Sequence, residues 1–350
     1  MKRKRSKNDL KENEHPPLKK KLKNKPTMIE ICAGAGGLSA GFEKAGFDIL
    51  LLNEINKDCC QTLRINHKNI KVSCKDVRNL SLKKYNNVDV LVGGIPCQSF
   101  SVAGLARGLD DKRGEIIYEF IRLIKECNPK TFLIENVKGL YFHDKGKTLK
   151  HMIELIGNDG KYKVEHKVLN SNNHNVPQKR ERLFIVGIRN DLKVQSFEFP
   201  CAMQYKPVLK DVLENIPLSM GSKYPEKKIK VFDLVPQGGC WIDLPKNIQE
   251  EYMGQKMIRS SGGGSRGVAR RLSMEKPCLT LLTSPSQKQT ERIHPLETRP
   301  LTTREYARIQ TFPDDYEFYG SMTSVYKQIG NAVPVNMAQE VAFQIKKLLV

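Results

Sequence analysis

A cysteine in a polar loop is the first residue of this 350-residue chain whose setting suggests chemistry. Cys97 follows Pro96 and precedes Gln98, just beyond a Val/Leu-rich run at 88–92 that predicts a buried strand. Most cysteines in a reducing compartment are buried as small apolar side chains, and Cys127 fits that description. Because the neighbours of Cys97 are mostly polar or glycine, its thiolate could act as a nucleophile if the charge is stabilised.

Charged side chains stand at two further predicted strand ends. Glu135 follows the apolar run 132–134, and burial there would raise the pKa of its carboxyl so that it could donate a proton. Arg180 and Arg182 precede a predicted strand at 183–186, where two guanidinium groups suit an anion or a developing negative charge. A solvated basic face is the alternative for the arginines, and it would be preferred if they stood alone.

A glycine-rich turn lies between a predicted strand at 28–32 and a predicted helix at 38–45. Gly34, Gly36 and Gly37 would let the backbone approach a ligand closely. The turn resembles a dinucleotide fingerprint, but the third glycine of G-x-G-x-x-G is replaced by serine, and the turn is not a phosphate loop either. Tight packing of the helix against the strand is the alternative role for these glycines.

An acid strengthens the interpretation of this turn as a ligand site. Glu54 ends the next predicted strand, 48–52, about 20 residues after the glycines, where a carboxylate suits ribose hydroxyls. A solvated loop acid is the alternative.

The elements that must position these residues alternate between strand and helix. Further predicted elements are a helix at 59–67, a strand at 71–74 and a helix at 114–127 with apolar residues at helical spacing. This alternation predicts a doubly wound α/β fold with a mostly parallel sheet. Ligands of such sheets bind beyond the carboxyl ends of the strands, so the turn, Glu54 and Glu135 should meet there.

The pattern changes at residue 194. Pro and Gly become frequent and the alternation is lost, so we expect a smaller irregular domain at 194–299 after a first domain at 27–193. Helices are predicted again in the last segment, 300–350.

The net charge of +21 indicates a partner with dense negative charge, of which nucleic acid is the commonest. Residues 1–26 hold eleven Lys/Arg and three Asp/Glu, so the rest of the chain still carries +13. We expect this basic tail to be disordered, and it is either a loose DNA-attracting arm or a bipartite nuclear-import signal. The tail has no apolar stretch of a secretory signal, and no apolar run in the chain approaches a membrane span.

The nine cysteines predict a reducing compartment. None are spaced as CxxC pairs, so we expect no metal site.

Six blocks in order resemble the DNA cytosine-5 methyltransferase family, with the compact body of its prokaryotic and viral members. The similarity runs from about residue 28 to 347. The blocks are the glycine-rich turn, Pro96-Cys97-Gln98, Glu135-Asn136-Val137, the Gln-x-Arg-x-Arg at 178–182, the segment 299–314, and Gln328 to Pro334. The resemblance implies an S-adenosylmethionine-dependent methyltransferase fold, a target-recognition domain at 194–299, and a C-terminal segment that completes the catalytic domain.

The resemblance also implies roles for the residues of the reaction. Cys97, beside Gln98, would attack carbon 6 of a flipped-out cytosine in double-stranded DNA. Glu135 would contact ring nitrogen 3 and the exocyclic amine, and Arg182 with Arg180 would position the base. Carbon 5 would then take a methyl group from S-adenosylmethionine.

The resemblance assigns the cofactor site to a larger set. Glu54 would bind the ribose hydroxyls, Ile55 would cover the adenine, and Asp76 would accept from the adenine amine. The other expected contacts are Cys32, Ala33, Gly34, Gly36, Gly37, Leu38, Val77, Pro96, Asn331 and Val333.

Two residues depart from the family pattern. Cys32 stands where the family usually has Phe, and Ile95 stands where the loop usually has a first Pro. The first change removes one aromatic face of the adenine pocket and could lower cofactor affinity. Neither change removes a reacting group, so we expect an active enzyme.

The irregular domain offers basic residues for phosphates and base edges. The expected DNA contacts are Arg259, Arg266, Arg270 and Arg271. The protein is expected to be monomeric, and a restriction endonuclease acting on the same site is a possible partner. It would be nuclear in a eukaryotic host and cytoplasmic otherwise.

Three other functions compete with this interpretation. An RNA methyltransferase of the same fold is disfavoured because the Cys-Phe-Thr signature of the tRNA-modifying relatives is absent. A catalytically silent DNA-binding protein is disfavoured because Cys97, Glu135 and Arg182 are all present. A nicotinamide dehydrogenase fails on the incomplete fingerprint and has no use for Pro-Cys-Gln.

Overall fold

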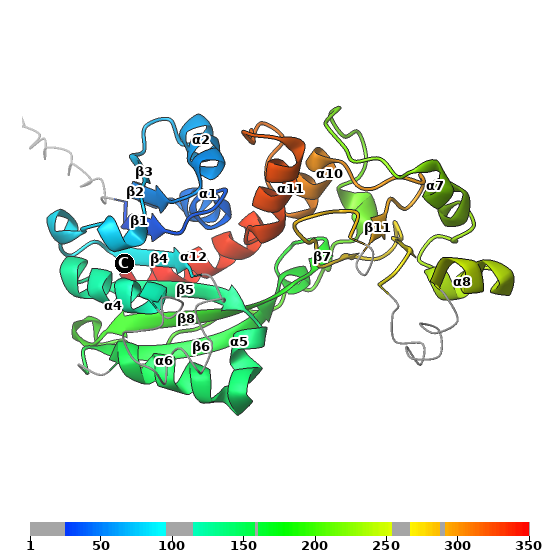
Figure 1. Ribbon diagram of the computed structural model, residues 1–350. Helices are drawn as coiled ribbons and strands as arrows, with labels where there is room; N and C mark the ends of the chain where they lie inside the picture. The colour runs from blue at the N-terminus through cyan, green and yellow to red at the C-terminus, as the bar shows by residue number, and fades with distance from the viewer. Residues whose placement is uncertain (1–24, 96–114, 158–159, 254–266, 288–290, 350) are drawn as a thin grey trace, which may run out of the picture.

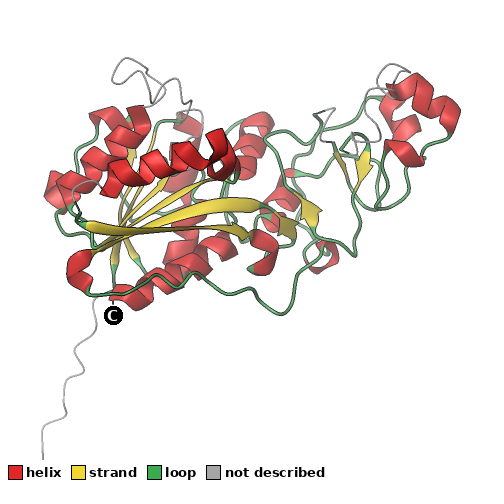
Figure 2. Cartoon of the chain, turned by 90° about the horizontal axis from the view of Figure 1, so that it is seen from below, coloured by secondary structure: helices red, strands yellow, loops and turns green. Residues whose placement is uncertain are grey.

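A seven-stranded sheet forms the body of the protein in the computed structural model, which describes residues 25–95, 115–157, 160–253, 267–287 and 291–349. The strand order is β3-β2-β1-β4-β5-β8-β6, and helices cover both faces (Figures 1 and 2). The strands are β1 (Thr27–Ile31), β2 (Asp48–Glu54), β3 (Val72–Cys74), β4 (Val90–Gly94), β5 (Thr131–Val137), β6 (Tyr162–Asn170) and β8 (Glu181–Arg189). The predicted α/β class with a mostly parallel sheet is confirmed.

The first five strands of this order pair in parallel, so each needs a crossover connection. Among the crossover helices are α1 (Gly37–Lys44), α2 (Lys57–Asn66) and α4 (Glu115–Cys127). Asn56 caps α2, because its side chain accepts a hydrogen bond from the Cys59 amide. The parallel pairing places the carboxyl ends of β1, β2, β4 and β5 at one edge.

Neighbouring residues of each buried strand serve opposite faces of the sheet, as the two-residue period of a strand requires. Met28 of β1 and Leu133 of β5 pack with α1 and with α12 (Val335–Leu349). Ile29 and Ile134 of the same strands pack on the other face with α4 and α6 (Lys147–Gly157). Apolar side chains on both faces explain why these strands read as nearly continuous hydrophobic runs.

The β5, β8 and β6 edge of the sheet is antiparallel. β6 was not predicted from the sequence, because Lys163, Glu165, His166 and Lys167 interrupt its apolar pattern. An edge strand can keep these polar residues in solvent. The antiparallel register places Arg182 opposite Val137, which is two residues from Glu135 and on the same face of β5.

The C-terminal segment returns to the body of the protein through three helices. α10 (Thr303–Ile309) begins with a capping box, in which the Thr302 side chain accepts from the Glu305 amide and the Glu305 carboxylate accepts from the Thr302 amide. α11 (Met322–Asn331) follows, and α12 then packs beside α1 (Figure 1).

A smaller unit with little regular structure lies away from the sheet (Figure 1). It contains α7 (Glu226–Phe232), α8 (Lys246–Met253) and the short strands β9 (Arg270–Arg271) and β11 (Arg292–Ile293). Its own apolar cluster is centred on Phe232 and Trp241. The segment with Cys278 and Leu281 instead shares a cluster with α10 and α11, so this part of 194–299 packs against the C-terminal return.

Candidate active site

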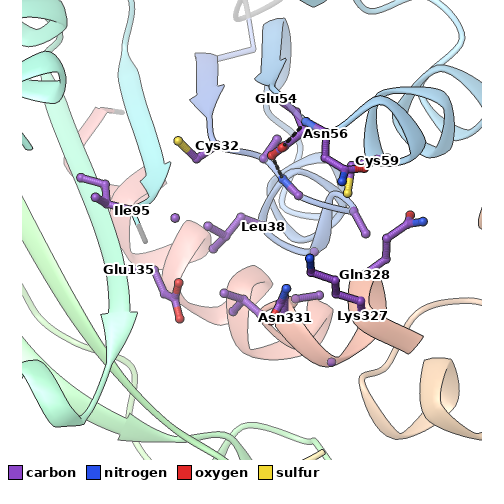
Figure 3. A pocket seen from close by; sticks show the side chains of 18 of the residues that line it. Cys32, Leu38, Glu54, Asn56, Cys59, Ile95, Glu135, Lys327, Gln328 and Asn331 are labelled. Atoms are coloured by element: carbon purple, nitrogen blue, oxygen red, sulfur yellow. Dashed lines mark hydrogen bonds between the residues drawn. The ribbon is translucent and has the colours of Figure 1, made fainter. Parts of the chain in front are cut away.

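A cavity of about 880 Å³ lies at the carboxyl ends of the parallel strands and is closed by α11 (Figure 3). It brings together most of the residues that the sequence assigned to the cofactor. Those that line it are Cys32, Ala33, Gly34, Leu38, Gly37, Glu54, Ile55, Asp76, Val77, Asn331 and Val333. Glu135, Arg180 and Arg182 line the same cavity.

Backbone amides hold the Glu54 carboxylate in place. Its Oε2 accepts from the Gly34 amide at 2.8 Å, and its Oε1 accepts from the Ile55 and Asn56 amides at 2.9 and 2.8 Å. A carboxylate has about four acceptor positions, so one remains for a ligand hydroxyl. The glycine-rich turn and the end of β2 are therefore joined by the residue expected to contact a ribose.

Asp76 already has a partner on its own loop. Its Oδ1 accepts from the Arg78 amide and Nε at 2.9 and 3.0 Å, and its Oδ2 accepts from Arg78 Nη2 at 2.6 Å. These hydrogen bonds lower the pKa of the Asp76 carboxyl, which keeps it ionised as an acceptor.

Two of the three glycines of the turn, Gly36 and Gly37, have different reasons to be glycine. A Cβ on Gly37 would stand 2.2 Å from the Val333 carbonyl oxygen, so this glycine lets the C-terminal return approach α1. Gly36 has φ +85°, and a Cβ there would stand 2.4 Å from the Tyr316 hydroxyl oxygen. Gly36 is not among the residues that line the cavity, so its expected cofactor contact is corrected to a packing role.

Cys32, the first departure from the family pattern, lines the cavity in a backbone conformation with φ 52°. Burial and then the Glu54 carboxylate raise the pKa of its thiol to about 12, so the thiol stays neutral. Ile95, the second departure, is buried against the apolar cluster beneath α4. Its carbonyl oxygen accepts from Asn136 Nδ2 at 2.8 Å, which fixes the strand end that leads to Cys97.

Glu135 and Arg182 form an ion pair at the cavity wall. Arg182 Nε lies 2.9 Å from Glu135 Oε1, and both side chains are largely buried. Burial raises the pKa of the Glu135 carboxyl, although the charges of Arg182 and Arg180 act in the opposite direction. The raised pKa makes this carboxyl easier to protonate than an exposed glutamate, and the contact with Arg182 keeps the side chain oriented.

The Arg180 guanidinium is buried and bound to backbone carbonyl oxygens, whereas we expected it to be free to contact the base. It is 1% exposed and donates to the carbonyl oxygens of Leu281, Gly330 and Asn331. These hydrogen bonds join the residue directly before β8 to the segment with Leu281 and to the end of α11. Its expected contact with the base is therefore corrected to a link between three segments.

Arg271 is likewise buried, and its guanidinium is hydrogen-bonded within the protein. It donates to the carbonyl oxygens of Val235, Phe232 and His294 and to the Thr298 hydroxyl, so the prediction that it contacts DNA is wrong. Arg270 is partly buried and donates to the Gly238 carbonyl oxygen at 2.8 Å. The other predicted residues, Pro96, Cys97, Gln98, Arg259 and Arg266, lie outside the described residues.

Glu30 is a cavity residue that the sequence reasoning missed. Burial raises the pKa of this carboxyl to about 8, and its Oε2 has no hydrogen-bond partner. An acid in the apolar run 28–31 was the available signal. The cavity also includes Asn56, Cys59 and Lys327, which no motif indicated, and Gln328, the first residue of the last motif block (Figure 3).

Comparison with known proteins places this geometry in a family. Residues 26–347 match the C-5 cytosine-specific DNA methylase family. The chain belongs to this family. It is 49% identical over 339 residues to the Type II methyltransferase M.Sau96I of Staphylococcus aureus, covering 95% of this chain and 78% of that protein. It is also 49% identical to M.Eco47II of Escherichia coli, covering 92% and 79%.

Solved structures agree with the fold. One, described as a DNA modification methyltransferase encoded within an E. coli prophage, has a TM-score of 0.68 at 25% identity, covering 93% of this chain and 99% of that one. The Entamoeba histolytica methyltransferase EhMeth has a TM-score of 0.67 at 15% identity, covering 93% and 99%.

The methylase is thus a DNA cytosine-5 methyltransferase that uses S-adenosylmethionine. Within the described ranges, no group of three or more His, Cys, Asp or Glu could hold a metal ion. No helix in that part of the chain is long and apolar enough to span a bilayer. The two bacterial relatives give no support to the nuclear interpretation of the tail, whose residues 1–24 lie outside the described part.

Proposed function

We propose that this methylase modifies one cytosine within a specific duplex DNA sequence through a covalent Cys97 adduct. The observation that supports this most is the Glu135–Arg182 pair, which lies on the same cavity as Ile95, two residues before Cys97. A carboxyl with a raised pKa, on the same cavity as the strand end that leads to a nucleophile, is what activation of the cytosine ring requires.

The cavity fits S-adenosylmethionine through the hydrogen-bond acceptors that line it. Glu54 keeps one acceptor position for a ribose hydroxyl, and Asp76 is an ionised acceptor for the adenine amine. Gly34, Leu38, Asn331 and Val333 would surround the remainder, and Ile55 would cover the adenine. When bound there, the cofactor supplies an electrophilic methyl group.

Cys97 begins the reaction in this proposal. Its thiolate adds to carbon 6 of the flipped-out cytosine, because carbon 5 is a poor nucleophile until that bond forms. Carbon 5 would then take the methyl group, with S-adenosylhomocysteine as the leaving group. Loss of the carbon 5 proton to a base and cleavage of the C6–S bond would restore the aromatic ring and the Cys97 thiolate.

Glu135 and Arg182 support the electron flow. A protonated Glu135 would donate to ring nitrogen 3, which accepts the electron density that the thiolate pushes into the ring. Arg182 would keep the carboxyl aimed at the base through its 2.9 Å contact. Gln98 would lie beside the nucleophile on the same loop.

The division into domains follows the same logic. We assign 27–193 and 300–350 to the catalytic domain, and 194–299 to target recognition, with Arg259, Arg266 and Arg270 as its expected DNA contacts. The relatives are Type II methyltransferases, so a restriction endonuclease acting on the same sequence is the expected companion. We propose a monomer that acts in the cytoplasm of a prokaryotic cell.

Methyl transfer to nucleic acid tests the proposal. The enzyme is incubated with S-adenosylmethionine tritiated on the methyl group and with either duplex DNA or tRNA. We expect label in DNA and none with Cys97→Ser, and bisulfite sequencing of the product then gives the target sequence. Label confined to tRNA, or label that persists in DNA with Cys97→Ser, would overturn the proposal.

A further inference from the structure

The back of the glycine-rich turn is held by a buried polar network that no step of the reaction uses. The Tyr316 hydroxyl donates to the Ala35 carbonyl oxygen at 2.7 Å and lies 3.3 Å from Nε2 of His67. His67 Nδ1 lies 2.7 Å from Oε2 of Glu43. These three side chains, Glu43, His67 and Tyr316, are called the turn network below.

The turn network joins three separate segments behind the cavity. Glu43 belongs to α1, His67 ends α2, and Tyr316 lies between α10 and α11. His67 is 3% and Tyr316 5% exposed, so their polar atoms are shielded from solvent. Buried polar groups are stable only when they are hydrogen-bonded, and the Tyr316 hydroxyl has such a partner in the Ala35 carbonyl oxygen, whereas the Glu43 side chain is 40% exposed.

The positions of the hydrogen atoms follow from the contacts. The Tyr316 hydroxyl has one proton, and the Ala35 carbonyl oxygen accepts it. Nε2 of His67 must therefore carry the proton between His67 and Tyr316. Nδ1 lies against the Glu43 carboxylate as a close contact of opposite polarity, without a hydrogen bond.

The glycine at position 36 of the turn is required by the close approach of this network. Gly36 is in the left-handed region, and a Cβ there would stand 2.4 Å from the Tyr316 oxygen and 3.1 Å from His67 Nε2. Ala35, whose carbonyl Tyr316 holds, lines the cavity on its other side. The conformation of the cavity-lining backbone therefore depends on a hydroxyl group that does not itself line the cavity.

We propose that Tyr316, supported by His67 and Glu43, is a positioning residue for S-adenosylmethionine. It holds the glycine-rich turn in its binding conformation before the cofactor arrives, so that less order has to be gained on binding. The inference rests on the proposed cofactor site. Because the turn network does not touch the reacting atoms, it should affect cofactor affinity and leave methyl transfer in the saturated enzyme unchanged.

Removal of one hydroxyl group tests the role of Tyr316. Tyr316→Phe leaves the Ala35 carbonyl oxygen without its donor, and we expect the Kd for S-adenosylmethionine, measured by calorimetry without DNA, to rise about tenfold. The KM for the cofactor should rise equally, and kcat at saturating cofactor should stay within about twofold. Tyr319→Phe is the matched control, because the Tyr319 side chain is 52% exposed on the same segment.

A pair of His67 variants separates positioning from simple packing. The amide nitrogen of Gln in His67→Gln can take the place of Nε2 and still donate to Tyr316. The amide nitrogen of Asn in His67→Asn can take the place of Nδ1 and reach only Glu43. We expect cofactor affinity near wild type for His67→Gln and a loss like that of Tyr316→Phe for His67→Asn.

Circular dichroism and denaturant unfolding verify that each variant is folded. An unchanged Kd in folded Tyr316→Phe, a fall in kcat with unchanged KM, or equal affinities in the two His67 variants would overturn the proposal. A wild-type enzyme that binds no S-adenosylmethionine would instead overturn the proposed cofactor site, and the role of the turn network with it.

Discussion

Glu135 is the side chain whose environment bears most directly on the chemistry. Burial raises the pKa of its carboxyl, so the acid keeps its proton at a higher pH than an exposed glutamate does. If the protonated form donates to the base, kcat falls as pH rises through that pKa. Glu135→Gln should lower kcat by about 10²- to 10⁴-fold and remove that limb of the pH profile.

The neighbouring acid provides the control for this substitution. Glu181 is exposed and pairs with Lys138 at 2.9 Å, so Glu181→Gln should leave kcat and its pH profile unchanged. A Glu135→Gln enzyme with wild-type kcat would contradict the assigned role of Glu135.

Glu30 gives a pH dependence of stability whose sign can be worked out. The pKa of this carboxyl is about 8 in the folded protein against an ordinary value of 4.5, so folding retains a proton that the unfolded chain releases. Its contribution is fully favourable below pH 4.5 and is lost as pH rises toward 8, at up to about 1.4 kcal/mol per pH unit. The Glu30→Gln variant should show a flatter free energy of unfolding over that range, measured by denaturant titration. Parallel pH profiles of wild type and variant would show that Glu30 does not titrate as described.

Residue types at strand ends were enough to predict Glu54 and Glu135, but not the buried acid Glu30 or the partners of the cations. Glu54 and Glu135 follow strands, and the topology brings such residues to one edge. Arg180 and Arg271 looked like DNA or base contacts because charge is visible in a sequence and burial is not. Their hydrogen bonds go to backbone carbonyl oxygens of segments far along the chain.

The contact between α1 and the C-terminal return is the element-scale feature that closes the cavity. A Cβ at position 37 would stand 2.2 Å from the backbone oxygen of Val333, which lies in the short connection between α11 and α12. Gly37→Ala should therefore displace the segment with Asn331 and Val333, raise the KM for S-adenosylmethionine at least tenfold, and lower stability by about 1–3 kcal/mol.

A second glycine variant checks this steric explanation. A Cβ on Gly139 would meet no atom closer than 3.8 Å, so Gly139→Ala should change neither the KM nor the free energy of unfolding appreciably. Equal effects of the two substitutions would show that the approach of Val333 is not what requires Gly37.

The elements of the parallel half of the sheet could be predicted because their strands are buried on both faces. β6 has no such signal, since its polar residues suit an edge that faces solvent. The antiparallel β5–β8 register is also a long-range pairing that no local pattern encodes. That register places Arg182 beside Glu135, so the sequence predicted both residues without predicting their contact.

The charge of the whole molecule divides between the tail and the body. Residues 1–24 carry ten Lys/Arg and three Asp/Glu, and deletion of residues 2–24 removes them while keeping the Pro26 carbonyl that accepts from the Asp48 amide. We expect kcat to stay within about twofold, while non-specific DNA binding weakens and depends less steeply on salt. Loss of turnover after this deletion would show that the tail belongs to the active fold.

The body should still bind DNA in a strongly salt-dependent way, because it carries most of the net charge. Affinity of the truncated enzyme for duplex DNA should fall roughly 10³-fold between 50 and 200 mM salt if it makes about six phosphate contacts. A DNA-binding constant that does not change with salt concentration would contradict phosphate contacts by the body.

Covalent trapping tests the central claim most directly. The enzyme is mixed with S-adenosylmethionine and duplex DNA that contains 5-fluorocytosine, in which carbon 5 has no proton to lose and the C6–S bond cannot break. We predict a complex that survives denaturation, with a mass equal to enzyme plus methylated DNA and the DNA attached at Cys97. No such complex should form with Cys97→Ala. A wild-type enzyme that methylates normal DNA without being trapped, or a trapped Cys97→Ala enzyme, would contradict the account.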